Sequence, residues 1–399
     1  MEGAWNDDGK GESIWDRFSH TPGKVLNGDT GDHAAEHYDR YQEDVDLMKK
    51  IGLQAYRFSI SWPRILPQGR GAINQKGIDF YSRLVDSLLN AGITPFATLY
   101  HWDLPQVLYE EGGWPVRNTA EAFVEYADVI SRALGDRVKN WMTHNEPAVV
   151  ATMGYLIGEH APGIKGDLVA TLKTAHHLLL SHGWSIPVIR QNSPGCEVGI
   201  VLNLGHHPTA SRSIADREAM LEQEAIWSRI YLEPLAGRRY PAELDEGLKV
   251  RGLPSVKEIM QIQPGDLESI ATPIDFIGVN YYTRRIVRNH EVPEEENLPQ
   301  TLFPAPKNEE NYTEMDWEVY PEGLLRVLGR LHFEYQFPKI YVTENGASYS
   351  DAPDINGRVR DERRTRYLRQ HFRVAHQAIQ LGIPLAGYFV WSLLDNFEW

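Results

Sequence analysis

KIYVTE, at residues 339–344, is a short apolar run that ends in a carboxylate, and runs of this kind recur along the chain. Seven of them are predicted strands: residues 55–60, 94–100, 138–143, 198–204, 275–281, 339–343 and 385–391. Helical patterns lie between them, for example at residues 78–91 and 119–134, and a glycine follows each of these two. Alternating strands and helices predict an α/β fold with a parallel sheet, of the TIM (β/α)8-barrel type.

The composition is that of a soluble protein with one large core. The 399 residues are 42% hydrophobic, which fits a single catalytic barrel domain over residues 1–399. A net charge of −15 disfavours nucleic acid and anionic membranes as partners. Cys196 is the only cysteine, so no internal disulfide can form, and no stretch is apolar enough for a signal peptide or membrane helix. We therefore expect a cytoplasmic protein with a small-molecule ligand.

Two glutamates stand at predicted strand ends. Glu146 follows the strand at 138–143, and Glu344 ends the strand at 339–343. Active sites of barrel enzymes lie at the carboxyl ends of the strands, where side chains from distant segments meet. A converging pair suits cleavage of a glycosidic bond, because one carboxyl group releases the leaving group and the other attacks the anomeric carbon. Either glutamate alone would more simply be explained as a salt-bridge partner in a loop.

The sequences around the two glutamates resemble the signatures of glycoside hydrolase family 1, the β-glucosidase and β-galactosidase family. These are Thr-x-Asn-Glu-Pro at 143–147 and Thr-Glu-Asn-Gly at 343–346. The resemblance extends from Glu2 to the last residue. Further similar segments are Tyr-Arg-Phe-Ser-Ile-Ser-Trp-Pro-Arg at 56–64, Tyr-His-Trp-Asp-Leu-Pro at 100–105, and Trp-Ser-Leu-Leu-Asp-Asn-Phe-Glu-Trp at 391–399.

The resemblance implies a retaining β-glucosidase that removes terminal non-reducing β-D-glucosyl residues by double displacement. Glu146 would be the acid/base and Glu344 the nucleophile. Expected substrates are small β-glucosides or cello-oligosaccharides, with β-galactosyl and β-fucosyl residues left open. No cofactor and no metal are expected.

Other site residues follow from the same motifs. Arg57 is expected to keep Glu344 ionised, and Asn280 and Tyr282 are expected to contact the reacting centre and orient Glu344. By resemblance the sugar hydroxyls would be bound by His101, Asn145 and Glu398, and the aromatic residues around the sugar would be Trp391, Trp102, Trp399 and, on the leaving-group side, Trp317.

The sequence also departs from the family. Members usually begin with a strand ending in Gln-Ile-Glu-Gly-Ala, whose glutamine binds the reacting sugar, whereas this sequence starts Met1-Glu2-Gly3-Ala4 and stops at Trp399. We therefore expect an incomplete barrel that lacks the first strand and the final helix. Its two open edges would allow a homo-oligomer, and the missing glutamine would lower activity.

Two other functions compete. A non-catalytic or inactive sugar-binding barrel fragment would explain the missing strand, although both glutamates are retained. A zinc peptidase is suggested by His33-Ala34-Ala35-Glu36-His37, which matches an inverted H-x-x-E-H pattern in which the histidines would lie one helical turn apart. A match of five residues is weak, and a segment leading into a helix explains it equally well.

Overall fold

The computed structural model describes residues 2–299, 307–308 and 310–397 and contains one curled sheet of seven parallel strands. The strands pair in chain order as β1 (Ala55–Ser59), β2 (Thr94–Tyr100), β3 (Asn140–Asn145), β4 (Glu197–Asn203), β5 (Phe276–Asn280), β6 (Ile340–Glu344) and β7 (Leu385–Tyr388). All seven predicted strands are confirmed, with ends that shift by a few residues at most.

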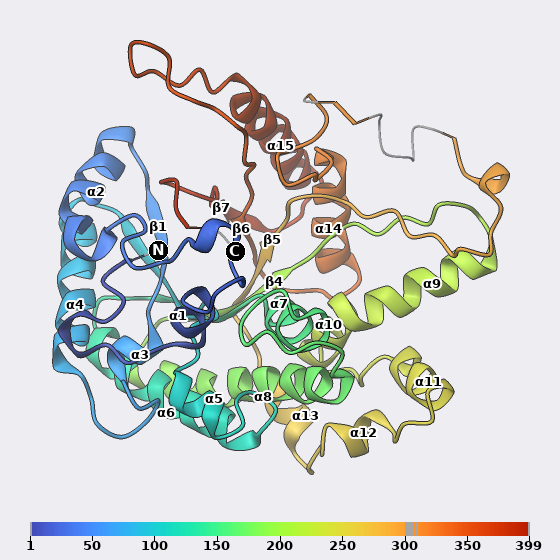
Figure 1. Cartoon of the computed structure of the whole chain (residues 1–399), viewed down its shortest axis with the longest axis horizontal. Helices are drawn as coiled ribbons and strands as arrows, with labels where there is room; N and C mark the ends of the chain where they lie inside the picture. Colours follow the sequence, from blue (N-terminus) through green and yellow to red (C-terminus); the bar gives the residue numbers. More distant parts are fainter. Residues whose placement is uncertain (1, 300–306, 309, 398–399) are drawn as a thin grey trace.

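Helices surround the sheet (Figure 1). They are α1 (Ile14–Ser19), α2 (His37–Ile51), α3 (Trp62–Ile65), α4 (Gln75–Asn90), α5 (Gln106–Glu110), α6 (Arg117–Leu134), α7 (Pro147–Ala151), α8 (Leu168–Asn192), α9 (Ile214–Glu224), α10 (Ile230–Leu235), α11 (Ala242–Val250), α12 (Val256–Ile259), α13 (Asp266–Ile270), α14 (Pro321–Phe333) and α15 (Glu362–Gln380). Short 3-10 turns occur at Asp7–Gly9, Leu26–Gly28 and Glu294–Glu296, and π-helical turns at Thr152–Ile157 and Ala225–Arg229. Neighbouring helices pack in pairs, among them α6 with α8 and α14 with α15.

An apolar layer fills the interior of the curled sheet. Four side chains from four successive strands are buried together, namely Phe96, Met142, Val201 and Phe276, and Ala55, Tyr341 and Phe389 pack against them. Their rings meet edge to face, as with Phe96 and Tyr341, whose centroids are 5.4 Å apart. This layer is the packed core expected inside a barrel, and it leaves the carboxyl ends of the strands for the polar side chains.

The sheet has two edges in the described part of the chain. There β1 pairs only with β2 and β7 only with β6. The α/β barrel architecture predicted from the sequence is therefore confirmed in the form of an open, seven-stranded sheet.

The zinc-peptidase prediction is wrong at the level of the backbone. Helix α2 begins only at His37, and Ala34 and Glu36 have left-handed backbones with φ of 45° and 51°. His33 and His37 are therefore not one helical turn apart, and the ring of His37 hydrogen-bonds instead to Asp44 at 2.6 Å. The segment is the turn that leads into α2.

The long loop predicted at residues 292–311 is confirmed where the structure describes it, because only a single 3-10 turn, Glu294–Glu296, occurs there. Residues 300–306 and 309 of this prediction lie outside the described residues. In the described part of the chain, no helix combines the length and apolar character that crossing a membrane would require.

Candidate active site

Glu146 lies at a sharp change of direction between β3 and α7. Its φ of 49° is left-handed, which is uncommon for a residue with a side chain and is often found at functional sites. Its backbone N–H donates to the Val201 carbonyl of β4 at 2.9 Å, and Pro147 starts α7 directly afterwards. Next to it, the pairing of β3 with β4 shifts register between Met142 and Asn145. The local backbone therefore places the carboxyl group at the carboxyl end of the sheet.

Glu344 ends β6, and a different donor binds each oxygen of its carboxylate. Arg57 of β1 donates from Nη1 to Oε1 at 2.7 Å, and the Tyr282 hydroxyl donates to Oε2 at 2.6 Å. The carboxylate is only 4% exposed, so this pairing is weakly screened by water. A cation and a hydrogen-bond donor both stabilise the charged form of a carboxylate. Glu344 is thus held as an ion, as the sequence predicts for a nucleophile.

Two asparagines link the two glutamates. Arg57 also donates from Nη2 to Oδ1 of Asn145 at 2.6 Å, and the same oxygen accepts from Asn280 Nδ2 at 3.1 Å. The second hydrogen of that amide nitrogen reaches Oε1 of Glu146 at 2.6 Å. Because the Thr343 hydroxyl donates to Asn280 Oδ1 at 2.7 Å, the amide can point its nitrogen only toward the glutamates. A continuous hydrogen-bonded path therefore joins Glu344 to Glu146.

The environments of the two glutamates differ. Glu146 is 4% exposed, and burial together with the negative charge of Glu344 raises its pKa to about 8. The hydrogen bonds from Asn280 and Asn203 oppose this rise only in part. Glu146 is therefore protonated at neutral pH beside an ion-paired Glu344, which is the division of labour that an acid and a nucleophile need.

The predicted sugar-binding residues on β2 and after β7 lie against the same network. Asn145 Nδ2 faces Nε2 of His101 at 3.3 Å, and the Trp102 indole N–H donates to the Asn145 carbonyl at 2.9 Å. The His101 ring stacks on Trp391 with centroids 5.7 Å apart. Burial, followed by the charge of Arg57, holds the pKa of His101 well below its usual range, so the ring is neutral. These side chains together form a polar surface with an aromatic side.

Trp317 lies farther out. It is 38% exposed, and its ring centroid is 5.2 Å from that of Tyr282, whose hydroxyl binds Glu344. Glu398 and Trp399, the last two predicted site residues, lie outside the described residues. The other ten predicted residues meet in one region: Glu146, Glu344, Arg57, Asn280, Tyr282, His101, Trp102, Asn145, Trp317 and Trp391.

The sequence analysis missed two residues of this network. Asn203 ends β4 and donates from Nδ2 to Oε1 of Glu146 at 3.2 Å, and Thr343 orients Asn280 as described above. A polar residue at the end of a predicted strand was the available signal for both. What selects them is the register, because Asn203 of β4 is paired with Asn280 of β5.

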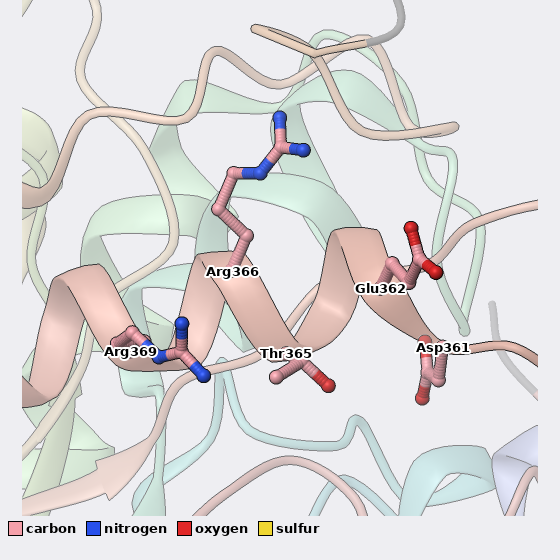
Figure 2. Close-up of a pocket in the computed structure, with 5 residues that line it drawn as sticks. All are labelled: Asp361, Glu362, Thr365, Arg366 and Arg369. Atoms are coloured by element: carbon pink, nitrogen blue, oxygen red, sulfur yellow. The ribbon is translucent and has the colours of Figure 1, made fainter.

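A surface hollow of about 380 Å³ lies elsewhere, along the start of α15 (Figure 2). It is lined by Asp361, Glu362, Thr365, Arg366 and Arg369, none of which contacts either glutamate. Within the described residues, no three histidine, cysteine or acidic side chains cluster closely enough to hold a metal ion. The hydrogen-bonded glutamate pair is therefore the candidate active site.

Comparisons with known proteins match this geometry. The model of the family described as glycosyl hydrolase family 1 covers residues 1–399. The chain is 47% identical over 401 residues to β-glucosidase A of Acetivibrio thermocellus, covering 100% of this chain and 87% of that protein. It is 46% identical over 400 residues to a 1,4-β-D-glucan glucohydrolase of Thermotoga neapolitana, covering 100% of this chain and 91% of that protein. The solved family 1 β-glucosidase of Thermotoga maritima superposes with a TM-score of 0.90 at 44% identity, covering 100% of this chain and 87% of that one. The chain belongs to glycosyl hydrolase family 1.

Proposed function

We propose that the protein is a retaining β-glucosidase in which Glu344 is the nucleophile and Glu146 the acid/base. In the first step, Glu344 attacks the anomeric carbon as the bond to the leaving oxygen breaks, and that oxygen takes the proton of Glu146. Arg57 and Tyr282 keep Glu344 ionised, and the pKa of about 8 keeps Glu146 protonated at neutral pH. The observation that carries the proposal is this pair of opposite protonation states within one hydrogen-bonded network.

The second step follows from the same electrostatics. Once Glu344 is esterified by the sugar it no longer carries a negative charge, and that charge is one of the two causes that raise the pKa of Glu146. Glu146 then ionises more readily and takes a proton from the water that attacks the glycosyl-enzyme. Two attacks on the same carbon retain its configuration.

The proposed sugar pocket is the surface around the network. His101 and Asn145 would bind hydroxyl groups, with Trp391 and Trp102 against the sugar ring and Trp317 beside the leaving group. Glu398 and Trp399 keep their predicted roles in sugar binding. The proposed substrates are small β-glucosides and cello-oligosaccharides, and the 46% identical glucan glucohydrolase supports the latter.

A non-catalytic sugar-binding barrel is less well supported. Sugar binding alone does not require two nearly buried carboxyl groups in different protonation states, and burying charge is costly unless it is paired. The names of the 47% and 46% identical relatives also describe glucosidases.

Stereochemistry of the first-formed product tests the proposal. Hydrolysis of p-nitrophenyl β-D-glucoside, followed by proton NMR within the first minutes, should show β-glucose first and α-glucose only later, by mutarotation. Initial formation of α-glucose would contradict the double displacement. Failure of the purified protein to release any glucose would contradict the enzyme assignment itself.

The remaining parts of the proposal concern organisation. We propose one catalytic domain over residues 1–399 and a cytoplasmic location, which the single cysteine supports. The strand edges at β1 and β7 support self-association, since an unpaired edge can add a strand from another chain. Sedimentation velocity over a range of concentrations should then show a dimer or larger species. A monomer at every concentration would contradict that association.

A further inference from the structure

Oε1 of Glu146 is doubly occupied. It accepts from Asn280 Nδ2 at 2.6 Å and from Asn203 Nδ2 at 3.2 Å. A carboxyl oxygen has two acceptor sites, and two N–H donors leave no room on it for a proton. In the described part of the chain, no side chain or backbone donor reaches the other oxygen, Oε2.

The sheet explains why the two amides converge. Asn203 and Asn280 are paired residues of the neighbouring strands β4 and β5. Val201, two residues before Asn203, points to the same side of β4 and is buried in the interior layer. Because the Val201 carbonyl also accepts the backbone N–H of Glu146, β4 holds the acid/base both by its backbone and by a side chain. Within the described residues, Glu146 is the one hydrogen-bond partner of the Asn203 side chain.

We propose that Asn203 is a positioning residue for the acid/base. Together with Asn280 it occupies Oε1 of Glu146, so that the transferable proton is held on Oε2 and leaves from there to the glycosidic oxygen. The inference rests on the proposed function, in which Glu146 is that acid. The balance of the step is unchanged: the bond between the anomeric carbon and the leaving oxygen breaks, its electron pair stays on that oxygen, and the proton moves from Oε2 to it.

Electrostatics assign a second effect to the same contact. The charged groups that face Glu146 are Glu344 from β6 and Arg57 from β1, and the two amides add to their influence. N–H donors stabilise the ionised carboxylate and therefore lower its pKa. Removing Asn203 should raise the pKa of Glu146 above its present value of about 8, and the alkaline limb of kcat/KM, where the acid loses its proton, should move to higher pH.

The test compares Asn203→Ala with the parent protein on two aryl β-glucosides. Phenol is a poor leaving group that needs the proton, whereas 2,4-dinitrophenolate leaves without it. We expect kcat/KM to fall about tenfold for the phenyl glucoside and by less than about twofold for the dinitrophenyl glucoside, with an upward shift of the alkaline limb. Asn203→Ser, which keeps a donor, should recover part of the loss. An equal fall for both substrates, or an unmoved alkaline limb, would overturn the inference.

The design separates this role from three others. Aryl leaving groups carry no sugar hydroxyls, so an asparagine that only binds a second sugar would leave both rates unchanged, which would also overturn the inference. Asn192→Ala is the matched control, because Asn192 likewise donates its amide to a carboxylate, Asp128 at 2.9 Å, but on α8. Glu146→Ala reports on the proposed function itself. If that variant shows no dependence on the leaving group, the acid/base assignment fails, whereas if it does and Asn203→Ala does not, only the inference about Asn203 fails.

Discussion

Glu344→Gln is expected to lower kcat/KM for p-nitrophenyl β-D-glucoside by about four to six orders of magnitude, the range typical of losing a covalent nucleophile. The substitution keeps the size of the side chain but replaces the attacking carboxylate with an amide. It also leaves the Arg57 guanidinium, whose side chain is 6% exposed, without its counter-charge, so the variant should unfold at a lower temperature as well. Circular dichroism and a thermal melt establish that the variant is folded before its rate is measured.

A matched substitution isolates the chemistry from the loss of an ion pair. Glu197→Gln removes a carboxylate that also pairs across strands, with Lys339, but at the opposite end of the sheet. We expect it to leave kcat/KM within about twofold of the parent value, as is usual for a partly exposed surface pair. A fluorinated glucoside that traps the intermediate should add its mass to the peptide containing Glu344. Labelling of another residue, or turnover by Glu344→Gln within tenfold of the parent, would refute the nucleophile assignment.

Glu146→Ala is expected to slow substrates with poor leaving groups by about 10²–10⁴-fold and to affect activated aryl glucosides far less in kcat/KM. Glu146 has a pKa of about 8, so kcat/KM of the parent protein should fall as the pH rises through this value and the acid loses its proton. The variant has no such group, and its alkaline limb near pH 8 should disappear. Measurement of kcat/KM between pH 5 and about pH 10 checks both statements.

Chemical rescue gives an independent check of Glu146. The shortened side chain leaves space beside the anomeric carbon, and azide, which needs no base, should enter it and attack the glycosyl-enzyme. The expected product is β-glucosyl azide, formed faster as azide is added, whereas the parent protein should show no such acceleration. An α-glucosyl azide, or a variant whose alkaline limb stays at its original position, would contradict the acid/base role.

Most of the fold could be predicted because the strands carry their own signal. Each is a short apolar run, and β2 was predicted to the residue at 94–100. The strand at β7 was predicted to continue to 391 but ends at Tyr388. Apolar residues continue past that point, yet their backbone leaves the ladder to follow the interior, where Phe389 packs on Phe96 at 5.0 Å. Hydrophobic pattern alone does not distinguish these two fates.

The parts of the site that could not be predicted depend on the backbone. Asn203 ends its strand like any other asparagine, and only the register of β4 with β5 brings it to Glu146. The left-handed φ of 49° at Glu146 has no signature in the sequence, since residues of this type rarely adopt it. The H-x-x-E-H pattern failed for the same reason, because left-handed residues at 34 and 36 interrupt what spacing alone would read as a helix.

The hydrogen bond between Arg57 and Glu344 joins residues 287 positions apart and connects β1 with β6, which are not neighbours in the sheet. Strands next to each other can pair as the chain collapses, but this contact forms only after the whole sheet has curled and the entropy of a very long loop has been lost. Catalytic competence is therefore acquired last during folding. Activity consequently reports on the folding of the entire molecule, and it should be lost before secondary structure when the protein is heated.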